Sequence, residues 1–198
     1  MEDTIPLLIK LGYTGMVAAI LPVYAVCYGW RNFLWFSDIA LVGTAVALWL
    51  ESALLASMMA VGVLLPELLW SASFLGRLLF GLRVTDLAGY MLDPAKPRYL
   101  RALSLFHLVL PVTLLWMLAR LGYDARAFVA QTALAWIVLP VTYAVVRPQD
   151  ENINWVYGPG ERQSRLSPRM YLVLLMLAFP LVIYVPSHFG LKAWFPPG

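Results

Sequence analysis

The sequence predicts an all-α membrane protein, one integral domain over residues 1–198 folded as a bundle of six transmembrane helices. Hydrophobic residues make up 62% of the chain and charged residues only 13%, whereas a soluble domain is roughly 45–50% apolar and about 25% charged. The mean hydropathy is +0.76, and the aromatic content of 14% excludes a disordered chain. The apolar runs are continuous rather than alternating, which excludes a membrane β-barrel.

The first three predicted spans are separated by very short turns. Each is a run of about 20 mostly apolar residues, long enough for a helix to cross a bilayer. Residues 11–29 form the first span, between two basic residues. Residues 32–50 form the second and carry one acid, Asp38, and residues 52–76 form the third and also carry one acid, Glu67.

Two of the last three predicted spans are preceded by longer polar connections. Residues 102–119 form the fourth span, which carries His107, and residues 127–146 and 170–188 form the fifth and the sixth. Polar segments of more than 20 residues precede the fourth and the sixth spans. We expect the first of these segments to hold a short interfacial helix.

The basic residues give the spans a direction. With six spans, ten of the 14 Lys and Arg residues fall on one side, namely Arg31, Arg77, Arg83, Lys96, Arg98, Arg101, Arg147, Arg162, Arg165 and Arg169. Positive-inside counting places this side in the cytoplasm and both termini outside, in what we expect to be a bacterial cytoplasmic membrane. The net charge is only +3, so the basic residues indicate topology, and no nucleic-acid partner is expected.

Polar side chains within the spans are predicted to gather near the cytoplasmic side. A helix rises about 1.5 Å per residue, which puts His107 roughly 8 Å, Asp38 roughly 9 Å and Glu67 roughly 13 Å from that side. Ionisable groups inside a membrane are costly and indicate function. We therefore expect a pocket that opens to the cytoplasmic leaflet, with these candidate substrate-binding residues: Glu67, Tyr143, Asn154 and Tyr157.

Several chemistries are excluded by what the sequence lacks. The one cysteine, Cys27, permits no disulfide within the chain and no CxxC motif. The two histidines, His107 and His188, fall at opposite depths, so no metal site is expected. The chain has no Gly-rich phosphate loop, dinucleotide fingerprint, GxSxG elbow or haem motif, so no cofactor is expected.

The sequence remains compatible with catalysis by a nucleophile and a general base. A hydroxyl becomes a nucleophile when a base, usually histidine, takes its proton. Ser37 and His107 fall at matching depth and are the candidate catalytic pair, and Asp38 would orient His107 or bind a polar head group. A lipid ester is the natural substrate and membrane lipid the expected partner, because it can enter sideways from the bilayer.

A structural interpretation stands beside each of these roles. Serines in membrane helices commonly pack or bond to their own backbone, and Asp38 and His107 could simply be internal hydrogen-bonding groups. Glu67 follows Pro66, which frees a backbone carbonyl, so a buried protonated glutamic acid is plausible there. The alternative function is therefore a non-catalytic membrane protein, either a small-solute carrier or a scaffold. The sequence does not indicate an oligomeric state.

Four segments resemble the androgen-induced family of six-span membrane hydrolases (FAR-17a/ADTRP-like) and the related YwaF-like bacterial membrane proteins. In order, they are RNFLWFSDIAL, MMAVGVLLPELLW, LFHLVLPVTLLWM and NWVYG, which begins at Asn154. The resemblance implies hydrolysis or transfer of fatty acyl esters by a nucleophile from span two and a histidine from span four, here His107. The hydrolases carry threonine in span two. Phe36-Ser37-Asp38 is more similar to the Cys-Asp pair of the YwaF-like branch, with Ser37 in place of cysteine.

Overall fold

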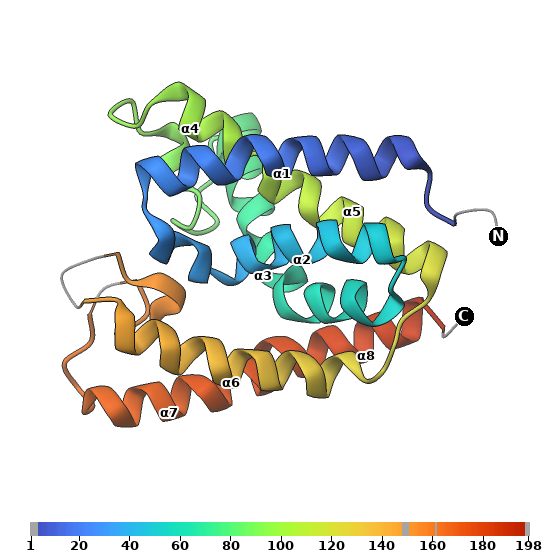
Figure 1. The fold of residues 1–198 in the computed structure, drawn as a ribbon. Coiled ribbons are helices and arrows are strands. Elements are labelled where there is room, and N and C mark those ends of the chain that lie inside the picture. The colour runs from blue at the N-terminus through green and yellow to red at the C-terminus, as the bar shows by residue number, and fades with distance from the viewer. Residues whose placement is uncertain (1–3, 148–150, 161, 197–198) are drawn as a thin grey trace.

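The computed structural model describes residues 4–147, 151–160 and 162–196, and this part of the chain is helical, without strands. Figure 1 shows long helices packed side by side, with tight turns between some of them and longer connections after α3 and α6. The fold class is therefore the predicted one, an all-α membrane protein. Five helical segments are long and apolar enough to cross a membrane.

The helices begin and end as follows. The α-helices are α1 (Leu7–Cys27), α2 (Phe36–Leu50), α3 (Ala53–Phe80), α4 (Arg98–Leu103), α5 (Phe106–Leu121), α6 (Ala127–Val145), α7 (Pro168–Ala178) and α8 (Val185–Trp194). Short 3₁₀ segments lie between them: η1 (Trp30–Leu34), η2 (Gly89–Leu92) and η3 (Ile153–Trp155). A π-helical segment, η4 (Phe179–Tyr184), joins α7 to α8.

Two of the membrane-length segments are interrupted. Helices α4 and α5 together cover Arg98–Leu121 and are broken between Leu103 and Phe106. Helices α7 and α8 form one run over Pro168–Trp194, and the wide turns of η4 lie at Pro180. Proline removes an amide donor from the helix and disrupts its regular hydrogen bonding, which accounts for an irregular segment at this position.

The second predicted span differs from the others. Its helix α2 has only 15 residues, because Trp30–Leu34 winds into the 3₁₀ segment η1 and Trp35 is extended with ψ 135°. Five of the six predicted spans thus meet the length expected of a membrane-crossing helix. The remaining one, the second predicted span over residues 32–50, stays a prediction. The other predicted spans also end a few residues from the observed helices, and the third continues to Phe80 rather than residue 76.

Helix α3 is the centre of the bundle. It is the most buried of the long helices and packs against α2, α5, α6 and α8. Small residues allow close approach: Gly62 lies directly against the side-chain amide of Gln131 on α6, and Gly43 on α2 lies against Met59 of α3. Small residues at helix contacts are typical of membrane bundles, where packing rather than water expulsion holds helices together.

Helices α1 and α2 are joined firmly at the end away from Arg31. The Lys10 ammonium lies 2.8 Å from Oε1 of Glu51, and Lys10 is buried. The Glu51 carboxylate also accepts the backbone N–H groups of Thr4 and Ile5 at 2.9 and 3.1 Å. The bond from Lys10 and these N–H donors hold the pKa of Glu51 down at about 2. This cluster, together with the hydrogen bond from Trp49 to Thr14, fixes one end of the α1–α2 contact.

Candidate functional site

Glu67 and His107 form a close pair between α3 and α5. Nδ1 of His107 lies 2.8 Å from Oε2 of Glu67, and the two side chains are 15% and 4% exposed. A carboxylate that accepts the Nδ1 proton fixes the tautomer of the imidazole and leaves Nε2 as its free acceptor. The pair therefore has the arrangement of a histidine base oriented by a carboxylate.

Aromatic rings hold the His107 imidazole in one plane. Trp70 lies one turn beyond Glu67 on α3 and stacks on the imidazole at a centroid distance of 4.6 Å. Phe106 stacks on the imidazole at 4.1 Å. The Ser71 hydroxyl donates to the backbone carbonyl of His107 at 3.3 Å. These contacts limit rotation of the imidazole, so its Nε2 has a defined direction.

Asp38 pairs with Asn32 where η1 meets α2. The Asn32 amide donates from Nδ2 to Oδ2 of Asp38 at 2.9 Å, and both side chains are buried. The second oxygen of Asp38, Oδ1, is buried and has no hydrogen-bond partner within the described chain. Asp38 lies in the first turn of α2, where the helix dipole favours an acid.

Ser37 and Asp38 lie on different faces of α2. Ser37 is half-buried and follows the spacing of Leu41, Thr44 and Leu48, which are fully buried on the inner face. Asp38 instead lines a groove toward α1. No hydrogen bond joins Ser37 to His107 in the part of the chain that the structure describes, and the His107 ring bonds to Glu67. The structure thus pairs His107 with Glu67, not with Ser37.

The loop residues of the candidate site bond to the main chain. Asn154 donates to the carbonyl of Leu34 at 2.7 Å and accepts the N–H of Phe36 at 3.1 Å. Tyr157 donates its hydroxyl to the carbonyls of Tyr143 and Val146 at 3.0 and 2.8 Å. The Tyr143 and Tyr157 rings lie 5.2 Å apart. These side chains hold the loop after α6 against the start of α2 and the end of α6.

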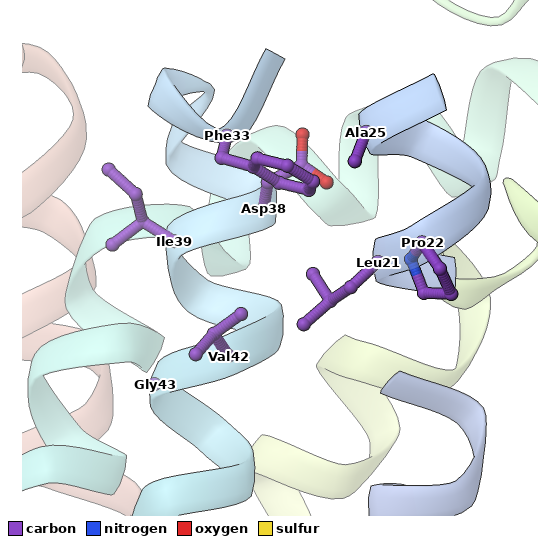
Figure 2. A pocket seen from close by; sticks show the side chains of 8 residues that line it. All are labelled: Leu21, Pro22, Ala25, Phe33, Asp38, Ile39, Val42 and Gly43. Carbon is purple, nitrogen blue, oxygen red and sulfur yellow. The ribbon is translucent and has the colours of Figure 1, made fainter. Parts of the chain in front are cut away.

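An apolar groove of about 710 Å³ lies between α1 and α2. Figure 2 shows Leu21, Pro22 and Ala25 of α1 on one side and the residues of η1 and α2 on the other. The lining on that second side comprises Phe33, Asp38, Ile39, Val42 and Gly43. The Asp38 carboxylate lies behind the Phe33 ring and extends toward α1 (Figure 2). Asp38 is the one ionisable residue in an otherwise apolar lining.

A polar pocket of about 240 Å³ lies on the other side of the Asn32–Asp38 pair. Its lining comprises Tyr28, Arg31, Asn32, Val146, Glu151 and Ile153. Asn32 therefore belongs to this polar pocket, while its hydrogen-bond partner Asp38 belongs to the apolar groove. The sequence indicates Asn32 only as the start of the second predicted span. Its position six residues before Asp38, at the polar end of that span, is the sequence signal for its role as a partner of Asp38.

The described residues contain no group of three His, Cys, Asp or Glu side chains that could hold a metal ion. The comparisons with known proteins add no family: no family model, no curated protein and no solved structure matches the chain.

Proposed function

We propose that this chain is an intramembrane lipid-ester hydrolase or acyltransferase. The observation that carries the proposal is the partly buried contact of 2.8 Å between Glu67 and His107. The apolar groove between α1 and α2, which is lined by Asp38 and not by Ser37, has a volume within the range of small-molecule sites. The resemblance in four segments to lipid-ester hydrolases agrees with this chemistry. We also place the chain in a bacterial cytoplasmic membrane, with the Arg31 end of α2 facing the cytoplasm.

In the proposed reaction, Ser37 is the nucleophile and His107 the general base. Nε2 of His107 takes the proton of the Ser37 hydroxyl as Oγ bonds to the ester carbonyl carbon. The ester C–O bond then breaks, and the departing alcohol takes the proton from His107, which leaves an acyl-serine. Water, or a second alcohol in the transfer reaction, attacks the acyl-serine by the same steps. Glu67 stabilises the imidazolium that forms in each half-reaction.

The reaction requires a movement of Ser37. Its hydroxyl has no hydrogen bond to His107 in the described structure, so the pair must close on substrate binding. Catalytic hydrogen bonds are often long in a free enzyme and shorten in its complex with substrate. The half-buried position of Ser37 on the inner face of α2 leaves its short side chain room to turn. In this proposal Asn154 fixes the start of α2, and Tyr157 fixes the loop after α6 to the end of α6.

A serine-reactive fluorophosphonate probe tests the proposal on the full chain in membranes. We expect one labelled site, lost in Ser37→Ala and strongly reduced in His107→Ala. Ser187→Ala is the matched control, because Ser187 is a buried helical serine that only donates to the carbonyl of Ile183. Labelling that survives Ser37→Ala, or an unlabelled wild-type protein, would contradict the proposed nucleophile.

The second candidate is a lipid-binding membrane protein without catalysis. The observation that favours it is the separation of the buried polar groups into Asn32–Asp38 and Glu67–His107, with Ser37 outside both pairs. Such groups can bind a lipid head group without attacking an ester. Lipid binding with neither probe labelling nor ester turnover would establish this function over the first.

A further inference from the structure

The apolar groove and the polar pocket meet at one hydrogen bond. Asp38 lines the groove and Asn32 lines the pocket, and the two side chains are joined at 2.9 Å. An apolar surface that ends at a polar one has the shape of a site for an amphiphile, with the chain on one side and the head group on the other. The groove lies between two helices that carry exposed apolar residues, including Val26 on α1 and Val46 on α2, so a lipid can enter from the bilayer.

Oδ1 of Asp38 is an acceptor without a partner. Asp38 is only 3% exposed, and this oxygen has no hydrogen bond within the described chain. A buried polar atom without a partner is costly, so a ligand that donates a hydrogen bond there gains affinity. Hydroxyl and amine groups can donate to this oxygen, whereas the head group of an ionised fatty acid has no hydrogen to donate.

The lining of the polar pocket carries groups of both signs. Arg31 and Glu151 both line it, beside the amide of Asn32. One basic and one acidic side chain give the pocket no preference for an anion over a cation. A hydroxyl group both donates and accepts hydrogen bonds, so a head group with several hydroxyls is compatible with this lining.

We propose that the α1–α2 groove binds a single-chain glycerolipid, with the acyl chain along the groove and the glycerol hydroxyls at Asp38 and Asn32. The bound lipid would also be the substrate class of the proposed function, and in that respect the inference rests on the proposed function. Binding itself requires no catalysis. One hydroxyl donates to Oδ1 of Asp38. The chain lies against Leu21, Pro22 and Val42.

A non-hydrolysable probe separates binding from turnover. The full chain is reconstituted in phosphatidylcholine nanodiscs with a 1-O-alkylglycerol that carries a diazirine at the end of its chain. We expect photolabelled peptides that contain residues 21–25 and 39–43. Unlabelled alkylglycerol should displace the probe at a concentration at least about tenfold lower than a fatty acid or an alkyltrimethylammonium of equal chain length. Because the ether cannot be hydrolysed, a failure of catalysis leaves this result unchanged.

Two variants and one control complete the test. Val42→Trp fills the groove from a position that is already 37% exposed, and Asp38→Asn removes the carboxylate. Each should weaken binding of the probe by about tenfold or more. Val46→Trp is the matched control, because Val46 lies one turn farther along α2, is 45% exposed and does not line the groove. Labelling unchanged by Val42→Trp, or labelled peptides elsewhere, would overturn the site. A fatty acid or alkylammonium that competes equally well would overturn the assigned head group.

Discussion

Asn154 fixes the start of α2, although it lies 118 residues after Phe36 in the sequence, because its Oδ1 accepts the backbone N–H of Phe36 at 3.1 Å. Its Nδ2 donates to the carbonyl of Leu34 at 2.7 Å. The first N–H groups of a helix have no partner within the helix, so Asn154 acts as a capping residue supplied by another segment. Asn154 also has φ +51°, a left-handed conformation that asparagine adopts more readily than most residues.

Asn154→Ala should destabilise the protein by about 2 kcal/mol or more, since it leaves two buried main-chain groups without partners. Unfolding of the purified protein in detergent measures the change. Asn154→Asp keeps the acceptor for Phe36 and loses only the donor to Leu34, so its loss should be smaller. Equal losses in the two variants would show that the bond to Phe36 contributes nothing.

The Glu67–His107 pair predicts different effects for two substitutions of Glu67. Glu67→Ala removes the partner of a buried imidazole and should lower the free energy of unfolding by about 3 kcal/mol, whereas Glu67→Gln keeps an acceptor for Nδ1–H and should cost about 1 kcal/mol. If Glu67 positions the base, Glu67→Gln should lower kcat for ester hydrolysis and leave KM unchanged. A change in KM alone would contradict the positioning role.

Glu51 predicts a loss of stability in acid. Its pKa is about 2 in the folded protein, below the ordinary value of 4.5. A carboxylate with a lowered pKa stabilises the fold fully above its unfolded pKa, and this contribution is lost as the pH falls through the folded value. We therefore expect the difference in stability between wild type and Glu51→Gln to shrink between about pH 5 and pH 2. A difference that is constant over this range would contradict the linkage.

Gly62 predicts a steric effect at the contact of α3 with α6. A methyl group at this position would clash with the side-chain amide of Gln131, which is buried. Gly62→Ala should therefore destabilise the protein by about 1–3 kcal/mol. Gly12→Ala is the matched control, because no atom lies within 4 Å of its added Cβ. Adding Gln131→Ala to Gly62→Ala should recover part of the loss, and no recovery would place the strain elsewhere.

The helical class and most helix positions follow from the sequence, because long apolar runs have one stable form in a membrane. The start of α2 does not. The run of apolar residues continues through Phe33, Leu34 and Trp35, but the chain there is 3₁₀-helical and then extended. The partner that fixes this break, Asn154, lies far along the chain, and hydrophobicity alone carries no information about it.

The depth of a residue can be predicted from span direction, but its rotation about the helix axis depends on which helices are neighbours. Asp38, Glu67 and His107 were expected at similar depths, and the structure joins Glu67 to His107. Ser37 was expected to pair with His107, and no hydrogen bond between them is present in the described residues. The sequence predicts that Asn154 and Tyr157 line a pocket, and this stays a prediction. Both side chains bond to backbone carbonyls, a use of side chains that sequence spacing does not reveal.

The shortness of α2 has a consequence for the lipids beside it. Its 15 residues span about 22 Å, whereas the hydrocarbon core of a bilayer is about 30 Å thick. Val42, Val46 and Trp49 are exposed on its surface. If α2 crosses the bilayer as the sequence predicts, the acyl chains beside it would have to match a shorter apolar length, and such mismatch would thin the membrane locally. The glycerol layer of that leaflet would then lie closer to Asp38, at the depth that the proposed lipid site requires.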